Sequence, residues 1–279
     1  MGERGLAYLL LIGVMGFIAQ FVDGTLGMGY GVFSTSLLVA AGMLPAVASA
    51  SVHTAEVVST LVSGISHHTL GNVDRRLAAP LAGSGVLGAV IGALFLSNVP
   101  GALIKPWVAG ALLFMGILVL WRFAVKNGSR QAAAGPQVSE EGATTAELDE
   151  SPPGKGLATW KLVCIGFVAA AFDAFGGGGW GPISTPTLIL NHNVRPHQVV
   201  GSVNLAEFFV TLAASLTFFF ALGPEQFEWT VVVCLLAGGV IAAPVAAWVC
   251  RKLPHRWLGI LIGGLLILTN LRSLLLAIR

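Results

Sequence analysis

Residues 16–35 read GFIAQFVDGTLGMGYGVFST, and residues 166–185 read GFVAAAFDAFGGGGWGPIST. Each copy is an apolar run that ends in an aspartate, followed by a glycine-rich break, an aromatic residue and a second run that opens with Ser-Thr. Nine positions of the first copy carry the same residue 150 positions later. This duplicated, glycine-broken stretch is the most specific pattern in the chain.

The composition indicates a membrane protein. Of the 279 residues, 55% are hydrophobic and 10% are charged, and the mean hydropathy is +0.83. A soluble globular domain carries about 25% charged residues, so this chain has too little charge to cover a surface that faces water. The net charge of +2, without a basic and aromatic patch, argues against nucleic acid as a partner. The three cysteines lie in apolar runs without C-x-x-C spacing, which disfavours a metal or redox site.

A helix that crosses a bilayer needs about 20 mostly apolar residues. We expect an all-α membrane protein with ten helical segments, at residues 6–22, 30–44, 46–66, 78–97, 102–122, 158–173, 181–192, 197–222, 229–250 and 255–277. The first, second, sixth and seventh segments are short for a full crossing. Each short pair flanks a glycine break and either crosses the membrane or forms a re-entrant hairpin.

A polar stretch separates two halves. Residues 124–157 are punctuated by Pro and Gly and rich in Glu, so they cannot bury apolar surface and are expected to form a disordered linker. The domains we expect are therefore a first membrane repeat at 1–123 and a second at 158–279.

The duplication continues beyond the opening motif. Residues 45–61 read PAVASASVHTAEVVSTL, and residues 196–212 read PHQVVGSVNLAEFFVTL, with matches at an offset of 151. Each half is thus one unit of five segments. Because five is odd, the two units are expected to enter the membrane with opposite orientation, as an inverted repeat.

The positive charges give the expected sidedness. Cytoplasmic loops of membrane proteins carry an excess of Lys and Arg. Ten alternating segments place eleven of the fifteen Lys and Arg residues on one face and only Arg4, Lys105, Arg272 and Arg279 on the other. We therefore expect the linker to be cytoplasmic and both termini to lie outside, and re-entrant hairpins would leave this parity unchanged.

The glycine breaks predict a binding site. Short, glycine-interrupted segments at matching places in two inverted halves point to the substrate site of a transporter. Two helix N-termini that meet near the midplane can bind a small anion through backbone N–H groups and the helix dipole, and hydroxyl groups can add donors. The substrate-binding residues we expect are Gly27, Met28, Gly29, Tyr30, Gly31, Ser34, Thr35, Gly177, Gly178, Gly179, Trp180, Gly181, Ser184, Thr185 and Asn204.

Several ionisable residues lie inside apolar segments, where they are costly and often functional. Glu56 and Glu207 occupy equivalent places, preceded by His53 in one half and Asn204 in the other. Burial disfavours the charged form of a carboxyl, so these groups are candidates for proton coupling or for orienting the substrate. Hydrogen bonding between helices is the equally weighted alternative.

Two further aspartates, Asp23 and Asp173, end the apolar runs of the motif. We favour a role in capping or pinning the broken helices over direct contact with substrate, because a carboxylate would repel an anion. His53-x-x-Glu56 has the spacing of metal ligands on a helix, but its counterpart has Asn204 in place of the histidine, so we expect no metal.

The motif, the N-L-A-E segment at Asn204–Glu207 and the layout in two halves resemble the TauE/SafE family, bacterial membrane permeases often called sulfite exporters. The resemblance covers both halves and excludes the linker. It implies a multi-pass protein of the bacterial cytoplasmic membrane that transports sulfite, sulfoacetate or related organosulfonates, as an exporter or in some members an importer. The expected partners are thus a small sulfur anion and the bilayer, with a homodimer as the oligomer we consider.

The mechanism we expect is a secondary transporter that works by alternating access. The chain has no G-x-x-x-x-G-K-[ST] motif for ATP, and no cofactor is expected. One alternative is an uncoupled anion channel with the same site. A second is an intramembrane enzyme that uses Ser34 or Ser184 with His53, but Gly181-Pro182-Ile183-Ser184 lacks the G-x-S-x-G turn of hydrolases.

Overall fold

A computed structural model describes residues 3–121, 157–191 and 194–250, together with residues 260, 264, 266–268, 270, 271 and 275. Within these ranges the chain is helical and forms no strand. The elements are α1 (Glu3–Leu26), α2 (Tyr30–Ala40), α3 (Pro45–Thr69), α4 (Arg75–Asn98), α5 (Gly101–Trp121), α6 (Thr159–Gly176), α7 (Trp180–Asn191), α8 (Pro196–Leu222), the short 3-10 helix η2 (Pro224–Gln226) and α9 (Trp229–Val249).

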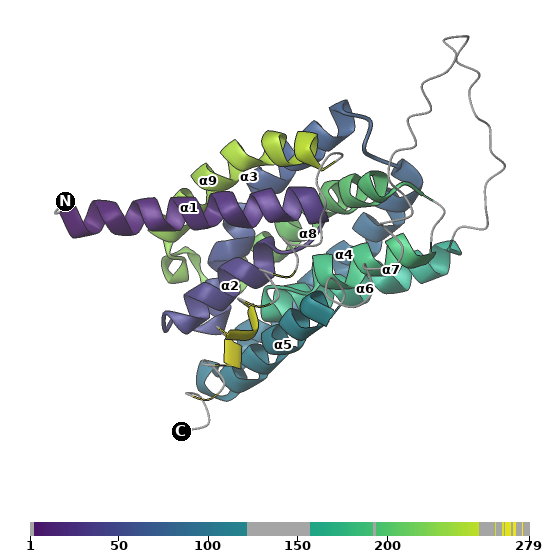
Figure 1. Cartoon of the computed structure of the whole chain (residues 1–279). Coiled ribbons are helices and arrows are strands. Elements are labelled where there is room, and N and C mark those ends of the chain that lie inside the picture. The colour runs from purple at the N-terminus through teal and green to yellow at the C-terminus, as the bar shows by residue number, and fades with distance from the viewer. Residues whose placement is uncertain are drawn as a thin grey trace, which may run out of the picture.

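Each half of the chain packs mainly on the other half. α1 lies alongside α9, as Figure 1 shows, and α6 packs along α4. α3 and α8 pack against each other, while α8 also packs on α4 and α3 on α9. In the sequence duplication α1 corresponds to α6 and α4 to α9, so every one of these contacts has a counterpart with the halves exchanged.

Two glycines of the duplicated motif allow close approach of these helices. A Cβ on Gly16 of α1 would overlap the backbone of Leu235 in α9, and a Cβ on Gly166 of α6 would overlap the backbone of Leu81 in α4. Gly16 corresponds to Gly166, and Leu235 to Leu81. Small residues at equivalent positions therefore bring the backbones together, as is common for helices in membranes.

Equivalent serines also make equivalent hydrogen bonds. The Glu228 N–H donates to Ser51 Oγ at 3.2 Å, and the Asp74 N–H donates to Ser202 Oγ at 2.8 Å. Each serine thus holds the start of a helix from the opposite half, α9 in one case and α4 in the other.

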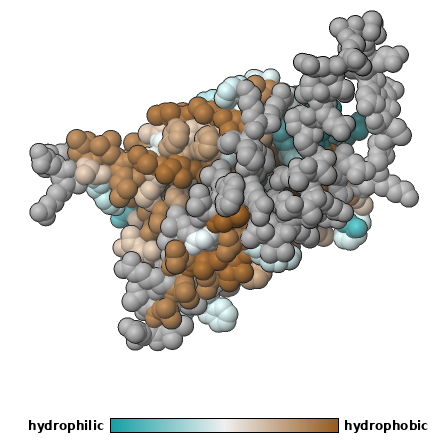
Figure 2. All heavy atoms as spheres, viewed as in Figure 1, coloured by the Kyte–Doolittle hydropathy of each residue, from teal (hydrophilic) through white to brown (hydrophobic). Residues whose placement is uncertain are grey.

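The helices fit a membrane location. Six of the described helices are long and apolar enough to cross a bilayer: α1, α4, α5, α6, α8 and α9. Apolar side chains cover much of the face over α1 and α9 in the space-filling view (Figure 2), and exposed residues include Leu10, Trp107 and Phe220. α3 has 25 residues but carries many Ser, Thr and His side chains, which are largely buried inside the bundle.

The expected shortness of the first and sixth segments was wrong. These runs were expected to end at Val22 and Asp173, but α1 continues to Leu26 and α6 to Gly176. The chain leaves each helix only at the first glycine with a positive φ, which is 68° at Gly27 and 70° at Gly177. The expectation holds for α2 and α7, whose 11 and 12 residues span less than about 20 Å at 1.5 Å per residue.

Two expectations lie largely outside the described residues. The linker at 124–157 is described only at Leu157, and the last expected segment only at the few positions given above, which are helical.

Candidate substrate site

The two glycine breaks pack directly against each other. A Cβ on Gly31 would lie 2.6 Å from the Gly177 carbonyl oxygen, and a Cβ on Gly181 would lie 2.8 Å from that of Gly27. The Thr185 hydroxyl donates a hydrogen bond to the same Gly27 oxygen at 2.5 Å. The motif copies, 150 residues apart in sequence, therefore meet inside the protein.

α2 begins at Tyr30, as expected, and α7 begins at Trp180, one residue earlier than expected, so Gly31 and Gly181 lie in the first turns. The preceding aspartate accepts a hydrogen bond from the backbone at the start of each helix. The Gly179 N–H donates to Asp173 Oδ1 at 3.0 Å, and the Tyr30 N–H donates to the Asp23 carboxylate. These contacts are the pinning that the sequence favoured for the two aspartates.

The capping changes one expectation about the helix N-termini. One N–H group at each short helix is already engaged by a carboxylate, so the termini do not present all their donors to a ligand. The next N–H groups, of Gly31 and Val32 in α2 and of Trp180 and Gly181 in α7, belong to the first turn, where helix geometry provides no internal acceptor.

Four carboxyl groups converge from four helices. The Glu207 carboxyl of α8 lies within hydrogen-bonding reach of Asp23 on α1. Asp173 of α6 lies beside His53 and Glu56 of α3. One side-chain nitrogen or oxygen atom of each of these three residues lies within 4.8 Å of those of the other two. All five side chains are buried, and each group joins residues from both halves of the chain.

His53 and Asn204, which correspond in the duplication, make different contacts. His53 Nε2 lies 3.2 Å from Asp173 Oδ2. The Asn204 amide donates to the backbone oxygens of Asp23 and Val200 at 3.4 and 3.2 Å, and its Oδ1 accepts from Ser63 Oγ at 2.7 Å. Asn204 is therefore held in place by neutral partners.

The hydroxyls of the two Ser-Thr pairs are buried near the starts of α2 and α7. Among the described residues, Ser34 Oγ, Thr35 Oγ1 and Ser184 Oγ have no hydrogen-bond partner. Leaving a buried polar group unpaired costs about 1–3 kcal/mol. A ligand or water that accepts or donates hydrogen bonds here would remove that cost.

Sequence reasoning missed Gln20, which lies on α1 one turn before Asp23. Its side chain is fully buried, and neither of its amide atoms has a hydrogen-bond partner among the described residues. A polar residue within an apolar run was the available signal. It was overlooked because the counterpart of Gln20 in the second half is Ala170.

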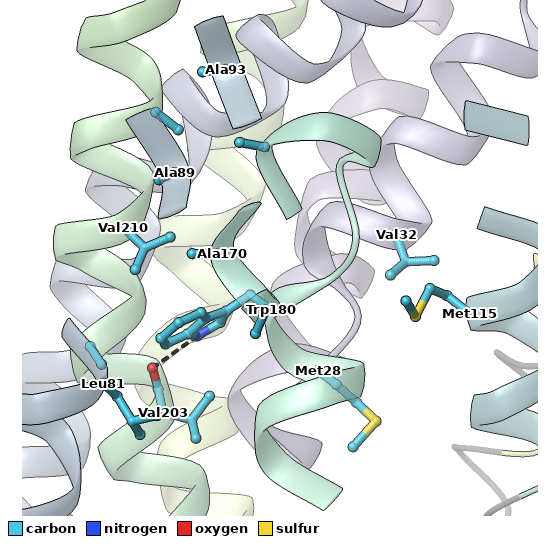
Figure 3. Packing of buried hydrophobic residues seen from close by; sticks show 14 of the residues in the cluster. Met28, Val32, Leu81, Ala89, Ala93, Met115, Ala170, Trp180, Val203 and Val210 are labelled. Atoms are coloured by element: carbon cyan, nitrogen blue, oxygen red, sulfur yellow. Dashed lines mark hydrogen bonds between the residues drawn. The ribbon is translucent and has the colours of Figure 1, made fainter. Parts of the chain in front are cut away.

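Trp180 belongs to the apolar core. Figure 3 shows its ring among Leu81, Val203 and Val210, with its Nε1–H donating to the Val203 oxygen at 3.2 Å. Met28 belongs to the same buried apolar cluster. Contact of these two side chains with substrate stays a prediction.

Two cavities lie away from the carboxyl groups. One, of about 360 Å³, is formed by α4 and α8, and the other, of about 550 Å³, by α4, α5 and α6. Apart from Arg75, their lining is apolar. Such grooves do not suit a hydrated anion, so the buried polar residues remain the candidate site.

Comparisons with known proteins agree with this picture of a membrane protein. The family model described as "Sulfite exporter TauE/SafE" matches residues 12–273. A similar protein, the "Probable membrane transporter protein YtnM" of Bacillus subtilis (strain 168), is 42% identical over 267 residues, which cover 96% of this chain and 83% of that protein. No solved structure matches the chain.

The family is one of transporters and not of enzymes, so the alternative of an intramembrane hydrolase is wrong. With its six candidate spans, the chain is a multi-pass membrane protein. The match over nearly its whole length shows that the chain belongs to the TauE/SafE sulfite exporter family of membrane transporters.

Proposed function

We propose that this protein is a secondary transporter of small sulfur-containing anions, such as sulfite, sulfoacetate or a related organosulfonate. It exports them across the bacterial cytoplasmic membrane by alternating access. Family membership supports the transport class, and the buried polar residues between the two halves support the position of the site.

One observation carries the proposal: buried hydroxyls that have no hydrogen-bond partner in the described part of the chain lie at the starts of the two short helices. Ser34, Thr35 and Ser184 offer O–H donors, and the first turns of α2 and α7 offer N–H donors and the positive ends of two helix dipoles. A tetrahedral or pyramidal oxyanion accepts several hydrogen bonds at once. This set of donors therefore fits such an anion.

The exchange of contacts between halves supports an inverted repeat. α1 packs on α9 as α6 packs on α4, and the Ser51 and Ser202 hydrogen bonds correspond in the same way. With five segments in each unit, the second unit has the opposite orientation in the membrane. The excess of Lys and Arg on one face of the sequence supports a cytoplasmic position for the 124–157 linker and an outside position for both termini.

The burial of the site supports alternating access. Ser34, Ser184, His53 and Asn204 have no exposed surface, and Glu207 is only 4% exposed. An anion can reach these groups only if the packed halves separate on one side. Movement of one repeat against the other around a central site is the usual way in which inverted-repeat transporters do this.

Counterflow in proteoliposomes tests the proposal. Vesicles loaded with unlabelled sulfite should take up labelled sulfite at a rate that saturates, and sulfonates should compete. The Ser34→Ala and Ser184→Ala variants should lower the rate at least tenfold, whereas Ser97→Ala on α4, away from the site, should not. Flux that never saturates and shows no counterflow would favour the alternative of a channel, and the absence of any flux of sulfur anions would reject the substrate class.

A further inference from the structure

We propose that His53, together with Asp173 and Glu56, forms a proton-binding site that makes the anion move with a proton, and that the equivalent cluster at Asn204, Asp23 and Glu207 lacks such a site. This inference rests on the proposed function. It goes beyond that function by assigning the coupling ion, the residues that bind it and the direction of coupling.

The charges around the site require positive compensation when an anion enters. Asp23, Asp173, Glu56 and Glu207 converge there, and the part of the chain that the structure describes has no buried Lys or Arg. Like charges in a medium of low polarity repel strongly. The anion is therefore bound best when the carboxyl groups carry protons, so anion and proton bind together.

Hydrogen-bond geometry shows where one proton is held. His53 Nδ1 lies 2.8 Å from the Ser49 carbonyl oxygen, which can only accept, so Nδ1 carries a hydrogen. His53 Nε2 lies 3.2 Å from Asp173 Oδ2. A contact of this length between two atoms with lone pairs requires one proton between them, on the nitrogen or on the oxygen.

Glu56 supplies a second acceptor beside this pair. Its side chain is 1% exposed, its Oε2 has no hydrogen-bond partner among the described residues, and it lies one helical turn from His53. The hydroxyl of Tyr30 on α2 lies near Glu56, and the Phe218 ring of α8 covers the imidazole at a centroid distance of 5.9 Å. A proton taken up here is thus shielded from water.

The equivalent cluster of the duplicated sequence lacks a histidine. The position equivalent to His53 is Asn204, whose amide does not titrate and is fixed by Ser63 and two backbone oxygens. The remaining carboxyls, Asp23 on α1 and Glu207 on α8, face each other. Among the described residues, only one of the two equivalent clusters therefore has a histidine beside its carboxyl groups, which indicates coupling through that cluster alone.

The coupling step is a proton transfer only. When the site is open to one side of the membrane, a side-chain nitrogen or carboxylate oxygen of His53, Asp173 or Glu56 accepts a proton from water on that side, and the anion binds. After the site opens to the opposite side, the N–H or O–H bond breaks, the proton returns to water, and the anion leaves. Nothing is oxidised or reduced, and the net direction follows the combined gradients of anion and proton. Export therefore requires an outward anion gradient that is larger than the opposing inward proton gradient.

The test compares accumulation driven by a pH gradient with counterflow at equal pH, in proteoliposomes with labelled sulfite and with protein-free vesicles subtracted. The wild type should accumulate sulfite severalfold more when the outside is acidic. His53→Asn, which introduces the residue found at the equivalent position 204, should lose that increase, so that its uptake relative to its own counterflow rate no longer depends on the pH gradient. His68→Asn, which changes an exposed histidine at the end of the same helix, should behave as the wild type.

The outcomes separate the two proposals. If the wild type shows counterflow and His53→Asn keeps the full increase in accumulation with an acidic outside, this inference alone is overturned. If the wild type shows no counterflow, the proposed function is overturned. Should His53→Asn fail to fold, Glu56→Gln must give the same loss of pH response, and a full response in that variant also overturns the inference. Loss of driven accumulation after chelation, restored by Zn²⁺ or Mn²⁺, would replace the proton site by a metal site.

Discussion

Thr60 and Thr211 face each other where α3 and α8 pack together, with their hydroxyl oxygens 3.3 Å apart. They are equivalent residues of the duplicated sequence, 151 positions apart. A contact between two copies of the same position is expected on a two-fold axis that relates the halves. The site residues also pair across the two halves, Asp23 with Glu207 and His53 with Asp173.

A cross-link at this contact should stop transport. In a variant whose native Cys164, Cys234 and Cys250 are replaced by serine, Thr60→Cys and Thr211→Cys together should be joined by oxidation or a short bifunctional reagent. If the halves move against each other here, cross-linked protein should lose more than nine tenths of its counterflow and recover it on reduction. Thr60→Cys alone is the control, and full flux in the cross-linked protein would contradict movement at this contact.

The proposed opposite orientation of the halves can be tested with thiol reagents that do not cross membranes. Thr69, the last residue of α3, and Glu225, in η2, are exposed and lie shortly before α4 and α9, which correspond in the two halves. In the same cysteine-free background, Thr69→Cys should react only from the cytoplasmic side and Glu225→Cys only from the outside. Labelling of both from one side would rule out the inverted arrangement.

The contact between the glycine breaks should not tolerate a methyl group. Gly31→Ala and Gly181→Ala would each place a Cβ within 3 Å of the opposite break, so the backbones must separate. We expect large losses of folded protein in size-exclusion profiles, as for other overpacked cores, where the cost is about 1–3 kcal/mol or more. Gly83→Ala on α4, where no atom lies within 4 Å of the added carbon, should fold as the wild type does.

Asp173 should matter for stability as well as for transport. Removing its carboxylate in Asp173→Ala leaves the Gly179 N–H and His53 Nε2 without their partner, at a cost of about 1–3 kcal/mol. The apparent Tm in detergent should fall by several degrees. Glu225→Ala, which removes an exposed carboxylate, should leave the Tm unchanged, and equal Tm values for both variants would refute the capping role.

Sequence reasoning located the helices well because each is an apolar run bounded by Pro, Gly or charge. The lengths of these runs also predicted that α2 and α7 are short. The same reasoning placed the ends of α1 and α6 too early, because Gly24 and Ala174 follow the aspartates without ending the helices. Only the backbone conformation shows that the turn comes at Gly27 and Gly177.

The candidate site was predicted as a set of residues, but its internal pairing was not. Duplication identified Asp23, Asp173, Glu56 and Glu207, yet nothing in the sequence indicates that Asp173 lies against His53, 120 positions away. That pairing depends on each half packing on the other. Gln20 was not predicted to belong to the site, because the prediction relied on polar residues that occur in both copies of the duplicated sequence, and Gln20 occurs in only one.

The most direct test of the account asks whether the buried residues between the halves bind a sulfur oxyanion. A ligand at 100 times its Kd stabilises a protein by about 2.7 kcal/mol. Sulfite should therefore raise the apparent Tm of the purified wild type, chloride should not, and the Ser34→Ala, Ser184→Ala double variant should lose the shift. A sulfite shift that is equal in both proteins, or no shift with sulfite or any sulfonate, would contradict the account.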